Sequence, residues 1–169
     1  MNSQVVRFDR YPLAIAILEN SVWFSIYALG SVLFLQLETW TAGAYAAYCV
    51  LSMYLVIPKL ICTHCSYFGS ICHSGQGRIA SLLFTKSDQT TFSAHFRSMT
   101  LAAPVFLAPL IAGLALTLIR FSWQILGTTL VFGVLALWCS RMVTLRLGCP
   151  HCKQQPICPA YLKSKGRSK

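Results

Sequence analysis

Four apolar stretches, each long enough to cross the roughly 30 Å of hydrocarbon in a bilayer, constrain the fold of this chain more than any other feature. The first contains one acid, Glu19, and the other three contain no charged residue. A soluble helix with a water-exposed stripe does not have this composition. The sequence therefore predicts an all-α integral membrane protein with four transmembrane helices, at residues 12–36, 42–58, 100–119 and 121–140.

Short turns at 38–41 and 120–121 join these stretches in pairs. Because a short link places consecutive helices side by side and antiparallel, we expect two antiparallel hairpins. The whole chain, 1–169, is then a single membrane domain. Outside the helices lie a loop rich in Cys and His, at 59–99, and a basic tail rich in Cys, at 141–169.

The distribution of Lys and Arg predicts the orientation. Of the fourteen such residues, only Arg120 falls on the side opposite to the N-terminus, the 59–99 loop and the tail. Since loops rich in Lys and Arg stay in the cytoplasm, we expect both termini there, with the chain in the cell inner membrane. The polar leader 1–11 and the long apolar run after it do not predict a cleaved signal peptide. The net charge of +10 follows from this orientation, so the expected partner is the lipid bilayer and no nucleic acid.

Each hairpin is followed by a Cys-x-His-Cys motif and then by a further cysteine. The first segment, 62–73, begins with Cys-Thr-His-Cys and ends with Cys-His. The second, 149–158, begins with Cys-Pro-His-Cys and ends with a cysteine. We name these segments the first and the second hook. Their similarity indicates a duplicated unit of hairpin plus hook, repeated about an axis along the membrane normal, with both hooks on the cytoplasmic face.

The hooks predict metal binding, because Cys-x-x-Cys is the spacing at which two thiolates bind one tetrahedral ion. One site of four cysteines and two sites of three cysteines and one histidine both fit. The expected metal is zinc, and Cys158-Pro159 makes an iron–sulfur cluster the alternative. His64 and His151 are expected to serve the opposite hook or to orient a thiolate. The candidate metal ligands are Cys62, Cys65, Cys72, His73, Cys149, His151, Cys152 and Cys158.

Other residues within the helices have less specific interpretations. Cys49 and Cys139 stand alone and are expected to pack as small hydrophobic side chains. Glu19 is a candidate functional residue, because an acid at that depth is costly. A structural partner for it would be Lys59 or Arg141, near the interface.

Three functions remain open. In the first, the hooks bind metal and staple the two hairpins into a platform for a soluble or membrane protein partner. In the second, the chain is a thiol oxidoreductase: it resembles the disulfide-bond-forming and vitamin K epoxide reductase enzymes, which join a small bundle to Cys-x-x-Cys pairs and a quinone. Those enzymes serve an oxidising compartment, whereas the hooks here are predicted to face the cytoplasm. In the third, the chain is similar in outline to small mercury or copper importers, with Cys49 as the first ligand of a soft metal.

Overall fold

The computed structural model describes residues 7–164, and within them every regular element is a helix. Four helices are long and apolar enough to cross a membrane, and they cover Leu13–Leu35, Thr39–His64, Gln89–Ile119 and Trp123–His151. The first is α1, Leu13–Leu35. The second contains α2, η1, α3 and η2, at Thr39–Leu51, Ser52–Val56, Ile57–Leu60 and Cys62–His64.

The third and fourth long helices are also composite. The third consists of η3, α5, η4 and α6, at Gln89–Thr91, Phe92–His95, Phe96–Ala102 and Ala103–Ile119. The fourth consists of α7, η5, α8, η6 and η7, at Trp123–Gly133, Val134–Cys139, Ser140–Val143, Thr144–Gly148 and Cys149–His151. The two short helices α4 and α9 cover Gln76–Leu83 and Pro159–Ser164.

Three of the four predicted segments were too short. The second and fourth helices continue past 58 and 140 and end within the hooks, and the third begins at Gln89 rather than at 100. The predicted second segment ended with the apolar run at Pro58, in the turn that also contains the charged Lys59. In the structure the π-helical segment η1 comes directly before this turn, and the helix continues through it. Charged residues such as Lys59 and Arg141 are compatible with a helix that extends beyond the apolar layer.

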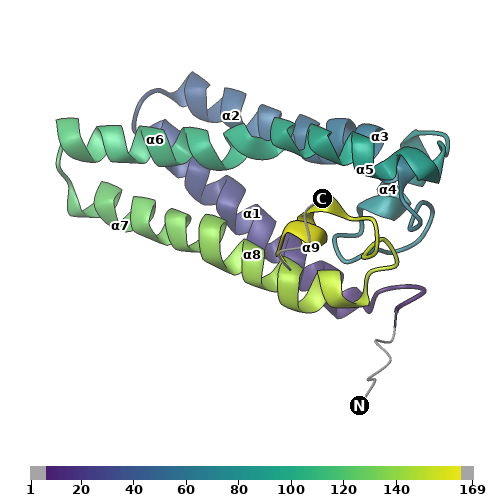
Figure 1. Cartoon of the computed structure of the whole chain (residues 1–169). Coiled ribbons are helices and arrows are strands. Elements are labelled where there is room, and N and C mark those ends of the chain that lie inside the picture. Colours follow the sequence, from purple (N-terminus) through teal and green to yellow (C-terminus); the bar gives the residue numbers. More distant parts are fainter. Residues whose placement is uncertain (1–6, 165–169) are drawn as a thin grey trace, which may run out of the picture.

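The long helices form a bundle in which α1 is central. It contacts α2, α6 and α7 and runs obliquely between them (Figure 1). The links at 36–38 and 120–122 lie at one end of the bundle, and both hooks lie at the other end beside the described start of the chain. Four large side chains at the centre of the bundle have no exposed surface. They are Ile26 and Leu33 of α1, Val105 of α6 and Phe132 of α7.

Much of the apolar surface of the long helices faces outward. Only 11% of the most apolar window of the fourth helix is buried in the bundle. Large side chains such as Leu118, Trp123 and Trp138 are 87%, 77% and 66% exposed. A soluble monomer does not expose apolar side chains on this scale, whereas lipid covers them at no cost. The outward face is therefore that of a membrane protein.

At Gly30, helix α1 packs closely against α2 inside the bundle. A Cβ atom at this position would lie 2.6 Å from the ring of Tyr45 on α2. The Tyr45 hydroxyl cannot easily move, because it donates a hydrogen bond of 2.9 Å to the carbonyl of Val105 on α6. One tyrosine thus connects three helices, and only glycine on α1 leaves room for it.

Candidate functional site

The two hooks begin with the same local backbone conformation. Each Cys-x-His-Cys motif begins as a 3₁₀ turn, η2 in the first hook and η7 in the second. The second cysteine of each motif then leaves the helix in extended conformation, with φ and ψ of −91° and 147° at Cys65 and −79° and 133° at Cys152. A change from helix to extended chain at the same residue turns both motifs away from their helices in the same way.

Three backbone hydrogen bonds repeat from one hook to the other. The N–H of Cys65 donates to the carbonyl of Cys62 at 3.2 Å, and Cys152 donates to Cys149 at 3.3 Å. The other two bonds of the first hook run from the N–H of Phe68 to the carbonyl of Cys65 and from that of Ser70 to Tyr67. Their counterparts in the second hook run from Gln155 to Cys152 and from Ile157 to Gln154. The third cysteine then comes one residue earlier in the second hook. The similarity seen in sequence is therefore also a similarity of local structure.

Six cysteines, three from each hook, line one cavity of about 160 Å³ at this end of the bundle. Its remaining wall is mostly apolar and includes Ile57, Ile61, Phe92 and Phe96. No Lys, Arg, Asp or Glu among residues 7–164 lines it. Of the eight candidate ligands, the cavity brings together seven, which are Cys62, Cys65, Cys72, His73, Cys149, Cys152 and Cys158.

The eighth candidate, His151, lies outside this lining. Its ring stacks on Phe8, with ring centroids 4.5 Å apart. His64, the other histidine inside a motif, stacks on His95 at 3.9 Å, and its Nδ1 lies 2.8 Å from the carbonyl oxygen of Asp88. Both motif histidines thus make contacts on the outside of the hooks, and His73 is the histidine that reaches the cavity.

Three of the thiols lie in one apolar cluster that contains residues of both hooks. Cys65, Cys72 and Cys152 pack around the buried rings of Tyr11 and Tyr67. Burial raises the pKa of Cys65 to about 12, and the nearby thiols of Cys72 and Cys152 add to this rise. Burial likewise raises the pKa of Cys152 to about 11. At neutral pH these thiols are protonated, so an ion that binds them must displace their protons.

The second cysteine of each motif accepts hydrogen bonds that favour its thiolate. The backbone N–H of Tyr67 donates to the sulfur of Cys65, and the N–H of Gln154 donates to that of Cys152, at matching positions. The Gln154 side chain acts across the hooks, since its amide also lowers the pKa of Cys65. This side chain is only 4% exposed and lines the cavity, and its Nε2 has no hydrogen-bond partner among residues 7–164.

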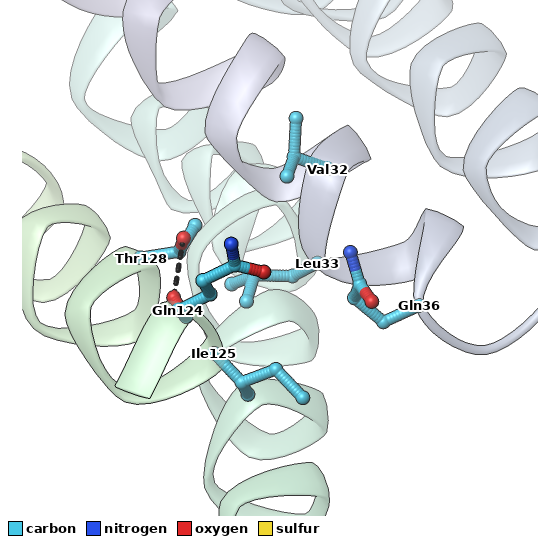
Figure 2. A pocket seen from close by; sticks show the side chains of 6 residues that line it. All are labelled: Val32, Leu33, Gln36, Gln124, Ile125 and Thr128. Atoms are coloured by element: carbon cyan, nitrogen blue, oxygen red, sulfur yellow. Dashed lines mark hydrogen bonds between the residues drawn. The ribbon is translucent and has the colours of Figure 1, made fainter. Parts of the chain in front are cut away.

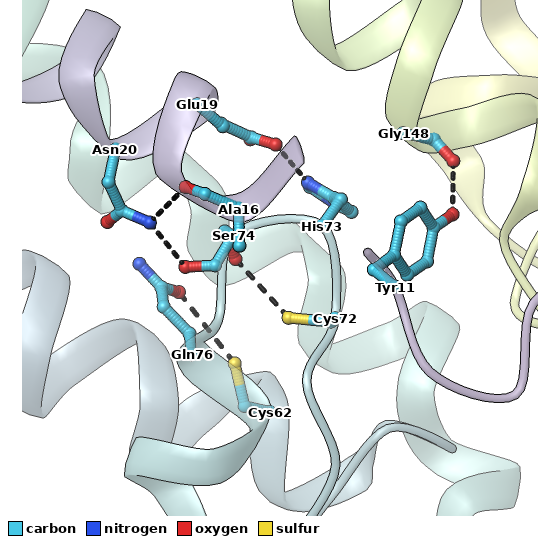
Figure 3. A network of polar contacts seen from close by, with 10 residues as sticks. All are labelled: Tyr11, Ala16, Glu19, Asn20, Cys62, Cys72, His73, Ser74, Gln76 and Gly148. Carbon is cyan, nitrogen blue, oxygen red and sulfur yellow. Dashed lines mark hydrogen bonds and ion pairs between the residues drawn. The ribbon is translucent and has the colours of Figure 1, made fainter. Parts of the chain in front are cut away.

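Glu19 is buried beside the first hook, and its partner is a histidine. His73 donates from Nδ1 to Oε2 of Glu19 at 2.5 Å (Figure 3). Burial alone would lower the pKa of His73, but the hydrogen bond and the charge of Glu19 raise it above its ordinary value. The predicted partners Lys59 and Arg141 are therefore wrong. Sequence spacing gave no signal for this pair, because α1 and the first hook are far apart in the chain.

The start of the described chain joins the two hooks. Tyr11 donates from its N–H to the carbonyl of Ile71 at 3.0 Å, and its hydroxyl donates to the carbonyl of Gly148. Phe8 donates to the carbonyl of His151 at 3.1 Å and accepts from the Tyr67 hydroxyl at 2.8 Å. Segment 8–11 thus forms hydrogen bonds with both hooks. The sequence did not predict this role.

The thiols surround a space and do not converge on one point. Among residues 7–164 no three Cys, His, Asp or Glu side chains are arranged to hold a single metal ion as they stand. All eight cysteines are free thiols. No family model, curated protein or solved structure matches this chain.

A second cavity, of about 320 Å³, lies at the opposite end of the bundle between α1 and α7 (Figure 2). Its polar lining consists of Gln36, Gln124 and Thr128, and the Thr128 hydroxyl donates to the carbonyl of Gln124 at 2.8 Å. No ionisable side chain of the described chain lines it.

Proposed function

We propose that this protein is an integral membrane metal-binding protein, in which the two hooks together bind metal and staple the helices into a rigid platform for a protein partner. One observation carries the proposal: six thiols from two hooks of matching conformation line a single cavity. Thiolates at this density bind zinc or iron rather than hard cations. The proposal includes two antiparallel hairpins, each followed by its hook, with hooks and termini in the cytoplasm.

The chemistry of the cavity favours binding over catalysis by a free thiol. A reactive cysteine needs a low pKa, which a neighbouring cation or a helix N-terminus supplies. Burial instead raises the pKa of Cys65 and Cys152. Thiols of this kind are inert until a metal ion displaces their protons. A thiol oxidoreductase therefore has less support than a metal protein.

Transport of a soft metal has less support as well. Cys49 and Met53 lie one turn apart on α2 and η1, and both are buried in the core of the bundle. On the next turns of the same helix, Ile57 and Ile61 lead to the cavity and offer no ligand. An ion would have to cross about 10 Å or more of apolar surface, given about 1.5 Å per residue.

Metal analysis of the full chain, purified in detergent without chelator, tests the proposal. We expect stoichiometric zinc or iron, lost in Cys65→Ser and in Cys152→Ser, because the two hooks share one cavity. Cys139→Ser is the matched control, since Cys139 lies in η5, outside the cavity lining, and this variant should keep its metal. A reduced wild-type protein that holds no metal, and binds none when zinc or iron is added, would disprove the proposal.

A further inference from the structure

The size of the cavity bears on what it holds. A volume of about 160 Å³ is on the order of five water molecules, at about 30 Å³ each, and far exceeds the space that one ion needs between four thiolates. The thiols are also spread around this volume, and no three of the described ligand side chains converge on a point. Thiols spaced in this way fit a group with several metal atoms, each of which reaches its own thiolate.

The positions of the histidines also favour a group with several metal atoms over two separate zinc sites. Two zinc sites of three cysteines and one histidine would use all six thiols and two imidazoles. His73 lines the cavity, but His64 and His151 lie outside its lining. A second imidazole is therefore missing for this pair of sites. A single zinc site with four cysteines would leave two thiols and most of the cavity unused.

On the basis of the proposed metal binding, we infer that the cavity holds a polynuclear iron–sulfur cluster that bridges the two hooks, with the Gln154 amide as a hydrogen-bond donor to its sulfur atoms. Cys65, Cys72 and Cys152 are the central ligands, because they belong to one packed cluster that contains cysteines of both hooks. One of the other three cysteines that line the cavity supplies the remaining ligand: Cys62, Cys149 or Cys158. An assembled cluster binds by ligand exchange. For each iron–thiolate bond formed, the bond from that iron to its previous ligand breaks, one S–H bond breaks and its proton goes to solvent, with no change in oxidation state.

Gln154 distinguishes this inference from a simple thiol site. Its side chain is 4% exposed and its Nε2 has no hydrogen-bond partner in the described part of the chain, which is costly in an apolar surrounding. The cluster would provide what this group lacks, since its sulfides and thiolates are anionic acceptors. Hydrogen bonds to cluster sulfur stabilise the reduced, more negative state and so raise the reduction potential. Gln154 is in this sense a positioning and tuning residue rather than a ligand.

The experiment is anaerobic purification of the full chain, or its reconstitution with ferric iron, sulfide and dithiothreitol, which reduces part of the iron, followed by assays of iron, acid-labile sulfide and zinc. We expect iron and sulfide together with broad visible absorbance, lost in Cys65→Ser, Cys72→Ser and Cys152→Ser. Stoichiometric zinc without sulfide would overturn the cluster and leave the metal-binding proposal standing. Failure to bind any of these metals would overturn both.

The role of Gln154 has its own readout. Gln154→Leu should keep its iron and sulfide but shift the reduction potential of the cluster to a more negative value, because one N–H donor is removed. Gln89→Leu, at the start of the third helix and outside the cavity lining, is the control and should keep the wild-type potential. If Gln154→Leu loses the cluster, Gln154→Glu keeps the shape of the side chain and should lower the potential further. An unchanged potential in a loaded Gln154 variant would refute this role.

Discussion

The carboxylate of Glu19 lies 2.5 Å from Nδ1 of His73, so a buried acid of the first transmembrane helix holds the residue next to Cys72. This pair fixes one nitrogen of the imidazole. Carboxylates often orient metal-binding histidines in this way and leave the other nitrogen for the ion. The same ring also packs on Gly148, where a Cβ atom would lie 3.0 Å from its Cγ. Glu19 therefore holds the end of the first hook against α1 and beside Gly148, which directly precedes the second hook.

Replacing Glu19 by Gln should lower the pKa of His73 in the metal-free protein. The carboxylate raises this pKa, whereas burial lowers it, so loss of the charge leaves burial to dominate. Because the folded-state pKa is raised, the pair stabilises the protein fully below about pH 6.5, and this contribution declines as pH rises through the folded value. Titration of the imidazole signals by NMR measures the shift, and the chain has only four histidines.

The control for this titration is Glu38→Gln, which removes the other glutamate, in the exposed link at the far end of the bundle. It should leave all imidazole signals unchanged. A His73 pKa that is equal in Glu19→Gln and wild type would contradict the assigned pair.

A methyl group at Gly77 should destabilise the first hook. Its Cβ would lie 2.2 Å from the carbonyl oxygen of Tyr67 and 2.7 Å from that of Ser70. These are backbone atoms, so the hook must shift, and overpacking of this kind costs about 1–3 kcal/mol. We expect Gly77→Ala to lower the thermal unfolding temperature. Gly43→Ala is the matched control, because its Cβ would meet no atom within 4 Å. An equal unfolding temperature in both variants would show that the hook tolerates the shift.

Alkylation of the reduced, metal-free protein should be slow at neutral pH. Iodoacetamide reacts with thiolates, and each unit of pKa above the ordinary value lowers the thiolate fraction about tenfold. With a pKa of about 11, Cys152 should react about 100-fold more slowly than an ordinary thiol, and Cys65, at about 12, more slowly still. Both alkylation rates should rise steadily as the pH is raised towards the pKa of each thiol. Peptide mass spectrometry at a series of pH values measures them, and rapid labelling of Cys152 at pH 7 would be inconsistent with its burial.

The four long helices could be predicted because their signal is local. A lack of charge over some twenty residues is visible in any window of the sequence. The helix ends were less predictable, since a helix that leaves the apolar layer no longer needs apolar residues. Thus Lys59 lies within α3 and Arg141 within α8, although both were placed in loops.

The cysteines of the site could be predicted as well, because Cys-x-x-Cys spacing is also local. Their surroundings could not, because they depend on segments far apart in sequence. Tyr11 and Gly148 are joined by a hydrogen bond, and Glu19 reaches His73, only once α1 lies between the hooks. One signal in the sequence marks Gln154: it follows the second cysteine of its motif by two residues, as Tyr67 does in the first hook.

Reporters fused to the chain should give opposite locations for the two ends of the bundle. A fluorescent protein that matures only in the cytoplasm should be active after Lys169, since thirteen of the fourteen Lys and Arg residues lie on that side. A periplasmic phosphatase fused after Arg120 should be active instead, because this link is at the end opposite to the hooks. Arg120→Glu is a useful variant of the second fusion, since it removes the one basic residue on that side and should strengthen the same orientation. Phosphatase activity after Lys169 would place the thiols in an oxidising compartment and would favour disulfide chemistry over metal binding.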